Sequence, residues 1–248
     1  MNERTPPTWP AGHRAALVVS IDVDGEYGVI AQHGASDWYW RAQAQYDLDA
    51  GLIRLLELLA DYDIRATFCW VGRVAEERPD AVRSVSAARH EIATHGWDHQ
   101  IYTRMTREEQ CEDLIRTREY LATLTGTVPV GHKSPFWHST PDTVPLLQEL
   151  GFQWNMDVAL GDLPVVQRPD PTREPIIQLP PSRWWDDYTL LHRASLATAP
   201  RGRVLGRGLR GGARRGQAHV PHRASVDHWP SGPLAGAGTL PGFRCDTR

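Results

Sequence analysis

The sequence predicts an α/β fold in which parallel strands alternate with helices within one large domain. Short apolar runs at 15–21, 66–71 and 90–94 have the length and composition of buried strands. Stretches at 48–62 and 106–124 have the lengths of helices. Acidic and imidazole side chains follow the first and third runs, and α/β folds place their sites at the carboxyl ends of parallel strands. A chain of 248 residues is long enough to bury a sizeable core.

The first half of the chain yields five predicted elements. The continuous apolar run at 15–21 is typical of a strand buried on both faces. Leucines recur at helical spacing within 48–62, which predicts an amphipathic helix, and a second strand follows at 66–71. Pro79 suits the first turn of a helix at 79–88. A third strand is predicted at 90–94.

The second half begins with a long helix whose two ends are marked in the sequence. Thr106 and Glu109 have the spacing of a capping box, and Gly126 is suited to ending the helix after about residue 124. The remaining predicted elements are a strand and loop at 131–137, a helix at 140–150, and strands at 152–156 and 176–180.

Two short motifs follow predicted strands and carry the groups of a metal site. Asp22 and Asp24 lie two residues apart, on one side of an extended chain, and His95 and His99 lie four apart after another strand. Either pair alone is also compatible with solvated turn residues. Found together at strand ends, they supply a carboxylate and two imidazoles for one divalent ion. The second carboxylate is then left to remove a proton, which favours metal-assisted hydrolysis.

These motifs resemble those of the polysaccharide deacetylase family, the NodB-homology or carbohydrate esterase 4 group, over about residues 9–191. The chain is most similar to its peptidoglycan-deacetylase-like and allantoinase-like branch. The resemblance implies a distorted (β/α)7 barrel in which Asp22 is the general base, whereas Asp24, His95 and His99 hold the metal. Zn²⁺ suits this ligand set, and Co²⁺, Mn²⁺, Fe²⁺ or Ni²⁺ could occupy the same ligands.

The family's later motifs match further positions. Lys133, the only lysine of the chain, stands where many members have an arginine that orients the catalytic carboxylate. By resemblance Lys133 therefore joins Asp22 as a catalytic residue, although an ordinary surface lysine is the alternative. The residues expected to line the substrate groove are Glu26, Pro135, Trp137, Asp157, Trp184 and Asp186.

The sequence changes character at its C-terminal end. Residues 201–248 contain nine arginines and two acids and show no periodicity. Read one base out of frame, this stretch permits segments like the family's last helix, its final strand with the catalytic histidine, and its closing helix. We therefore predict a truncated NodB-like domain at 1–199, with a barrel incomplete at its C-terminal end, and an out-of-frame, disordered tail at 200–248. A genuine basic tail that binds nucleic acid is the less favoured alternative.

The function predicted from these observations is metal-dependent hydrolysis of a non-peptide carbon–nitrogen bond, with N-deacetylation of an acetylated amino sugar or polysaccharide as the leading reaction. The alternatives are a cytoplasmic hydrolase of small cyclic amides, imides or ureides, and an inactive pseudoenzyme that lacks the last histidine. No segment resembles a secretory signal or a transmembrane helix, which predicts a cytoplasmic protein without a membrane partner. The expected partner is a small-molecule or oligosaccharide substrate, and a homo-oligomer remains open.

Overall fold

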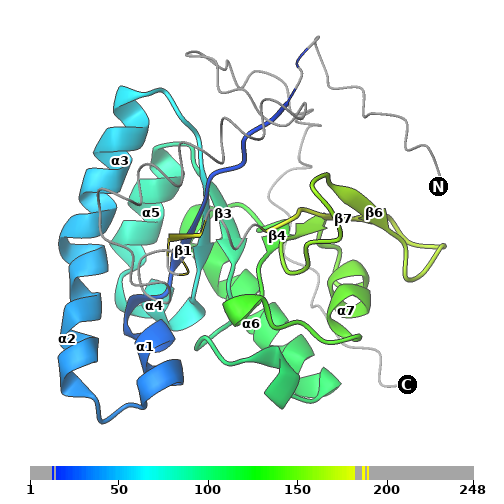
Figure 1. The fold of residues 1–248 in the computed structure, drawn as a ribbon, viewed down its shortest axis with the longest axis horizontal. Coiled ribbons are helices and arrows are strands. Elements are labelled where there is room, and N and C mark those ends of the chain that lie inside the picture. The colour runs from blue at the N-terminus through cyan, green and yellow to red at the C-terminus, as the bar shows by residue number, and fades with distance from the viewer. Residues whose placement is uncertain (1–12, 14, 182–185, 188, 190–248) are drawn as a thin grey trace. The chain divides into compact units, whose positions relative to one another are not determined.

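The computed structural model of the protein describes residues 13, 15–181, 186, 187 and 189 (Figure 1). These residues fall into two compact units, and residues 19–181 belong to the larger one, which contains the whole described sheet. The predicted tail at 200–248 lies outside the described residues, so its out-of-frame origin and the boundary at residue 199 stay predictions. None of the described helices combines the length and the apolar character that crossing a bilayer requires.

In the described part of the chain, seven strands form one sheet in the order β1-β2-β3-β4-β5-β7-β6. Neighbouring strands are parallel, except that β6 runs antiparallel to β7. Within the described residues β1 and β6 are the two ends of the sheet, which is therefore open. The predicted parallel α/β fold, incomplete at its C-terminal end, is confirmed. The strands are β1 (Ser20–Val23), β2 (Thr67–Trp70), β3 (Glu91–Thr94), β4 (Gly131–His132), β5 (Trp154–Asn155), β6 (Val165–Gln167) and β7 (Ile176–Gln178).

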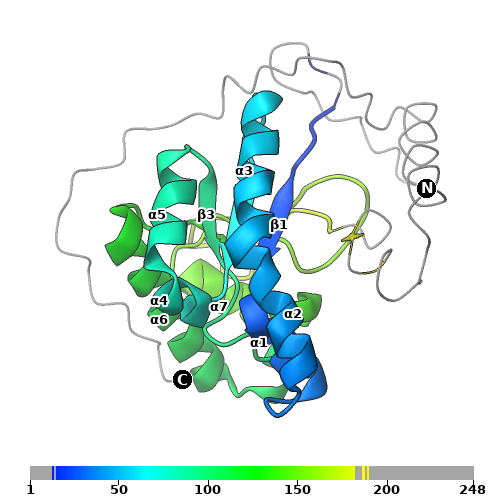
Figure 2. The ribbon, with the colours of Figure 1, turned by 90° about the vertical axis from the view of Figure 1, so that its left-hand side faces the viewer.

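Within residues 15–181, seven α-helices connect and cover the strands: α1 (Gly25–His33), α2 (Trp38–Tyr46), α3 (Leu52–Asp61), α4 (Gly72–Glu77), α5 (Pro79–Ala87), α6 (Arg107–Thr125) and α7 (Thr143–Glu149). A π-helical segment, Asp47–Gly51, joins α2 to α3, so that α2 and α3 form one uninterrupted helical stretch (Figures 1 and 2). The sequence did not predict α1, α2, α4 or β6. Helix α2 shows why, because Ala44 is its only buried residue and it therefore lacks an apolar stripe.

Helix α6 begins and ends as its sequence predicts. The Thr106 hydroxyl accepts a hydrogen bond from the Glu109 backbone N–H at 3.2 Å, and the Glu109 carboxylate accepts one from the Thr106 backbone N–H at 2.7 Å. Gly126 ends the helix with a left-handed φ of 71°, a conformation that glycine adopts without a steric penalty. Side chains of this helix contact one loop of the site.

The first strand is shorter than predicted. The apolar run at 15–21 was expected to be buried throughout, but β1 begins at Ser20, and the side chains of Leu17 and Val18 are 61% and 52% exposed. The pairing with β2 explains the difference, because its register starts with Ser20 opposite Thr67. Before Ser20, the carbonyl of Val19 still accepts the N–H of Thr67 at 2.9 Å, but Leu17 and Val18 lie outside the strand register.

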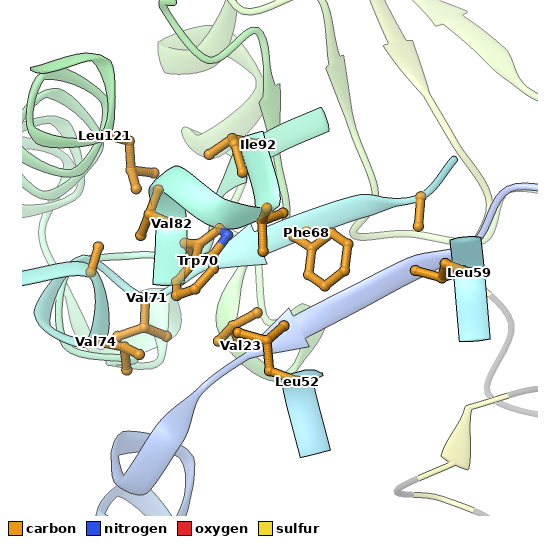
Figure 3. Close-up of a cluster of buried hydrophobic side chains, with 13 residues drawn as sticks. Val23, Leu52, Leu59, Phe68, Trp70, Val71, Val74, Val82, Ile92 and Leu121 are labelled. Atoms are coloured by element: carbon orange, nitrogen blue, oxygen red, sulfur yellow. The ribbon is translucent and has the colours of Figure 1, made fainter. Parts of the chain in front are cut away.

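The largest core cluster lies between one face of the sheet and the helices. Figure 3 shows Phe68 and Trp70 of β2 pointing into the cluster that Val23 of β1 and Leu52 and Leu59 also enter. A second cluster joins α6 and α7, and a smaller third one contains Cys69, Ala93, Trp154 and Met156. Cys69 and Ala93 alternate along their strands with Trp70 and Thr94, so this third cluster occupies the opposite face of the sheet.

One straight row of register partners crosses the sheet and fixes where the polar residues lie. Its members are, in order, Val23, Trp70, Thr94, His132, Asn155 and Gln178. The residue that directly follows Val23, Thr94 or His132 of this row is Asp24, His95 or Lys133, respectively. Asp22 directly precedes Val23. Because side chains alternate along a strand, these four groups share the face opposite Val23 and Trp70. The predicted site residues thus meet at the carboxyl ends of β1, β3 and β4.

Gly131 gives a test of this packing. A Cβ atom built at Gly131 would lie 1.9 Å from Cζ2 of Trp154, its register partner on β5. We expect Gly131→Ala to lower the free energy of unfolding by about 2 kcal/mol, since the indole of Trp154 must shift within a packed core. The midpoint of urea unfolding measures the loss. Gly51→Ala is the control, because Gly51 is helical and meets nothing closer than 3.5 Å; equal losses in both variants would contradict the assignment.

Candidate active site

The acidic motif at the carboxyl end of β1 contains a carboxylate held by a lysine that follows a distant strand. The ammonium group of Lys133 donates to both oxygens of Asp22, at 2.8 and 2.6 Å. Lys133 is 5% exposed and follows β4, which is separated from β1 in the sheet by β2 and β3. Lys133 is therefore not a surface lysine, and its charge is directed at one specific carboxylate.

The second carboxylate of the motif lies against the two histidines. Asp24 places one oxygen 3.5 Å from Nε2 of His95 and the other 3.4 Å from Nε2 of His99. One ligand atom from each of these three residues lies within 4.8 Å of the other two. Both imidazoles are about 1% exposed, so the cluster is shielded from water on the protein side. The structure thus brings together the three predicted metal ligands.

The hydrogen bonds of these groups leave atoms free to bind a cation. Nδ1 of His95 lies 2.6 Å from the carbonyl oxygen of Lys133, to which it can only donate, so Nε2 keeps its lone pair toward Asp24. Nδ1 and Nε2 of His99 and Oδ1 of Asp24 are buried without a hydrogen-bond partner among the described residues. Since buried polar atoms are normally paired, the unpaired Nε2 of His99 and Oδ1 of Asp24 fit a bound divalent ion.

The pKa shifts within the cluster also favour a bound cation. Burial lowers the pKa of His95, and it lowers the pKa of His99 to about 4, so both imidazoles are neutral at pH 7, as metal ligands must be. Burial, together with repulsion from Asp22, raises the pKa of Asp24 to about 6. Burial also disfavours the charge of Asp22, but the charge and hydrogen bonds of Lys133, together with electrostatic interactions with the two histidines, outweigh it and lower the pKa of Asp22. Asp22 is therefore the carboxylate that already has a cation, and Asp24 the one that lacks it.

The loop after β4 packs against the histidines. Phe136 places its ring edge-on to His99, with the ring centroids 4.6 Å apart, and Pro135 lies against Gly96. Phe136 and Trp137 both adopt left-handed backbone conformations, with φ values of 55° and 59°. Two consecutive non-glycine residues in this region mark a strained turn, of the kind that occurs at functional sites.

Asp157 holds this loop from beneath. Its carboxylate accepts the backbone N–H of Ser134 at 2.6 Å and the hydroxyl of Ser134 at 2.9 Å. Ser134 in turn contacts Nε2 of His132, whose Nδ1 lies 2.8 Å from the hydroxyl of Thr94. Asp157 is 4% exposed, and its hydrogen bonds anchor the residue that follows Lys133. We propose that Asp157 supports the site through Ser134, in addition to the lining role predicted from sequence.

The other predicted lining residues have varied surroundings. Glu26 forms a two-pronged ion pair with Arg41 of α2, with distances of 2.9 and 2.7 Å. The ring of Trp137 lies 5.4 Å from the ammonium nitrogen of Lys133, which places this side chain beside the Asp22 pair. Asp186 belongs to the smaller unit, where it accepts the backbone N–H of Thr189, and Trp184 lies outside the described residues. Their roles toward substrate stay predictions.

Two residues at the site were missed by the sequence reasoning. Phe136 contacts His99, and Asp113 of α6 accepts the backbone N–H of Trp97 between the two histidines. The acid in the middle of α6 carries no motif of its own. Its burial at 7% exposure on a helix that is otherwise rich in exposed charge is the signal that the structure adds.

Comparison with known proteins agrees with this geometry. Residues 49–154 match the family model described as polysaccharide deacetylase, a segment that contains both histidines and Lys133. Over this segment the chain is similar to polysaccharide deacetylases. The chain is 27% identical over 147 residues to the peptidoglycan deacetylase of Helicobacter pylori, covering 59% of this chain and 50% of that protein. It is 26% identical over 107 residues to a peptidoglycan-N-acetylglucosamine deacetylase of Bacillus cereus, covering 42% and 39%.

The structural comparisons extend the likeness beyond the family segment. A structure from Mycobacterium smegmatis, named as that of a polysaccharide deacetylase, matches with a TM-score of 0.77 and 26% identity, covering 86% of this chain and 78% of that chain. An allantoinase matches equally well in fold, with a TM-score of 0.77 at 23% identity, covering 87% and 78%. The chain spans half or less of the length of the curated relatives cited above.

Proposed function

We propose that the protein is a metal-dependent hydrolase that removes the N-acetyl group from an amino sugar within an oligosaccharide or polysaccharide. The arrangement that carries the proposal is the group Asp24, His95 and His99, with Asp22 beside it and already paired to Lys133. The relatives named as peptidoglycan deacetylases support the choice of an acetylated amino sugar. The fit of a carboxylate and two imidazoles supports Zn²⁺ as the ion.

Each residue has a distinct task in this reaction. Asp24 and the Nε2 atoms of His95 and His99 would hold the ion, which when bound supplies Lewis acidity toward the acyl oxygen and toward a water molecule. Asp22 accepts the proton of the water that attacks the acyl carbon. Lys133 keeps Asp22 ionised, because its ammonium group lowers the pKa of that carboxylate. The carbonyl of Lys133 fixes the ring orientation of His95, so the same residue positions both the base and a ligand.

The final step requires a proton for the departing amine. The family resemblance assigns this step to a histidine of the last motif, which the chain as written lacks. Loss of a general acid costs about 10²–10⁴-fold in rate. We therefore propose slow turnover for this chain rather than the rate of an intact family member.

A comparison of substrates tests the proposed function. Purified protein loaded with Zn²⁺ is incubated with N-acetylated chitooligosaccharides, and acetate release is measured; parallel samples contain allantoin or a cyclic imide, with ring opening as the readout. We expect acetate release above that of the Asp24→Ala variant and no ring opening. Ring opening without acetate release would replace the proposal with the cyclic-amide hydrolase. Metal binding without turnover of any substrate would replace it with the pseudoenzyme.

Lys133 provides a test of how the base is prepared. In Lys133→Met the side chain keeps a similar length but loses its charge, and the partly exposed carboxylate of Asp22 loses its ammonium partner. We expect kcat/KM for acetate release to fall by about 10²-fold, because a larger fraction of Asp22 is protonated and the remainder is less well oriented. Metal content should stay unchanged, as Lys133 contributes no predicted ligand atom. Unaltered kcat/KM would show that the ion pair has no part in the reaction.

A further inference from the structure

The loop that carries both histidines has a strained backbone that depends on contacts with other segments. Residues 95–99 include two left-handed positions, Gly96 with a φ of 75° and His99 with a φ of 60°. Glycine accepts this conformation readily, but for a non-glycine residue such as His99 it is sterically unfavourable. A strained ligand of this kind persists only where surrounding contacts fix it.

Backbone contacts secure the two flanks of the loop. The N–H of His95 donates to the carbonyl of Trp70 at 2.9 Å, which continues the sheet pairing. The N–H groups of Gly72 and Arg73, at the start of α4, donate to the carbonyls of Gly96 and Trp97 at 2.9 and 2.7 Å. These bonds leave the N–H of Trp97, in the centre of the loop, to be paired by something other than a strand or a turn.

A single carboxylate from α6 provides that pairing and more. One oxygen of Asp113 accepts the N–H of Trp97 at 2.8 Å, and the other accepts the hydroxyl of Tyr102 at 2.8 Å. Tyr102 is fully buried and stacks on His132, with ring centroids 5.5 Å apart. Asp113 is therefore hydrogen-bonded to the chain two residues before His99 and three residues after it. We call this pair of hydrogen bonds the bracket; it limits how far the backbone of His99 can depart from its left-handed conformation.

The same face of α6 also holds the side chain of Trp97. The guanidinium carbon of Arg116 lies 3.7 Å from the centroid of the Trp97 ring, and the ring of Tyr120 meets it edge-on at 5.7 Å. Asp113, Arg116 and Tyr120 are spaced at i, i+3 and i+7, which places them on one helix face. Gly72 closes the opposite side, where a Cβ would lie 2.3 Å from the indole.

From this geometry we infer that Asp113 is the positioning residue of the metal site, fixing the separation and direction of His95 and His99 through the backbone of Trp97. The inference rests on the proposed function only for the identity of what the histidines bind. Asp113 does not itself reach the ion or the substrate. Its role is to keep His99 in its left-handed conformation before any ion arrives, so that binding requires no rearrangement of the loop.

The test compares Asp113→Leu with a matched change one turn earlier on the same helix. Gln110 is 1% exposed, and its amide oxygen accepts the hydroxyls of Thr140 and Thr143 rather than any group of the histidine loop. Gln110→Leu therefore removes a comparable buried polar group from α6 without touching residues 95–99. Tyr102→Phe removes one half of the bracket, and Asp113→Asn keeps an oxygen that can accept the Trp97 N–H. All variants are made in the full chain.

Two readouts separate positioning from general stability. The first is hydrogen exchange of the Trp97 amide in protein freed of metal by chelator, which we expect to be at least about 10-fold faster in Asp113→Leu than in Gln110→Leu. The second is the Kd for Zn²⁺, from competition with a chromogenic chelator, which we expect to weaken by about 10–100-fold in Asp113→Leu and by less than threefold in Gln110→Leu. Asp113→Asn and Tyr102→Phe should fall between these two.

The outcomes are decisive in either direction. Equal exchange rates and equal Kd values in Asp113→Leu and Gln110→Leu would overturn the inference. Failure of the unaltered protein to bind Zn²⁺ would overturn the proposed function, whereas the exchange rates of the metal-free proteins would still decide whether Asp113 holds the loop. If Asp113→Leu does not fold, Asp113→Asn and Tyr102→Phe carry the same comparison against Gln110→Leu.

Discussion

Replacing Asp22 with asparagine is expected to lower kcat/KM for acetate release by about 10²–10⁴-fold while leaving metal binding intact. The asparagine side chain has nearly the same shape, but it cannot take the proton of the attacking water. Asp22 is suited to this task because Lys133 holds its carboxylate in the ionised form and its oxygens lie beside the metal cluster, 3.8 Å from Nε2 of His95. Initial rates on an N-acetylated chitooligosaccharide and the Zn²⁺ content of the same samples give the two readouts.

The separation of the two readouts is what makes this experiment informative. Asp22 and Asp24 are two residues apart on one strand end, yet the account gives them different roles. Loss of Zn²⁺ from Asp22→Asn would show that Asp22 is itself a ligand, and undiminished acetate release would show that another group is the base. Either result would require a new assignment of the two carboxylates.

Replacing Asp24 with alanine is expected to abolish stoichiometric Zn²⁺ binding and, with it, measurable acetate release. Asp24 is the one carboxylate in the three-residue cluster, and its charge is disfavoured without a cation because burial raises its pKa to about 6. Without it, two neutral imidazoles remain to hold a divalent ion. Isothermal titration of chelator-treated protein with Zn²⁺ measures the loss.

Asp98→Asn is the matched control for this variant. Asp98 lies next to His99 in the same loop, but its carboxylate accepts the side-chain amide of Gln100 at 3.1 Å and is not part of the cluster. We expect it to bind Zn²⁺ with the affinity of the unaltered protein. Zn²⁺ binding retained by Asp24→Ala would mean that the ion sits elsewhere, and equal losses in both variants would mean that the effect is only electrostatic.

The sequence predicts those features of the fold that depend on local patterns. The strands around Phe68 and Ile92, the capped helix α6 and the alternation of strands with helices all follow from runs of apolar residues and from capping residues. The convergence of Asp24, His95 and His99 is also predictable, because parallel strands bring their carboxyl ends to one edge. What the local pattern cannot supply is the register that makes Asp22 rather than Asp24 the partner of Lys133.

Other features depend on contacts between segments that are distant in the sequence. Asp113 is one of several acids on α6, and nothing in its neighbourhood distinguishes it from Glu112 until Trp97 and Tyr102 are placed against it. The predicted first strand begins too early in the sequence, because an apolar run indicates burial but does not indicate where pairing with the neighbouring strand starts. Helices α1 and α2 were missed because few of their residues are buried, so their amphipathic signal is weak.

The most direct test of the central claim is a crystal structure of the full chain grown with Zn²⁺, with diffraction data collected above and below the zinc absorption edge. We predict one strong anomalous peak bonded at about 2.0–2.2 Å to a carboxylate oxygen of Asp24 and to Nε2 of His95 and His99. Asp22 should remain paired with Lys133. A map in which Asp24 lies beyond bonding distance of an ion held by the two histidines, or in which zinc occupies a different site altogether, would contradict the account.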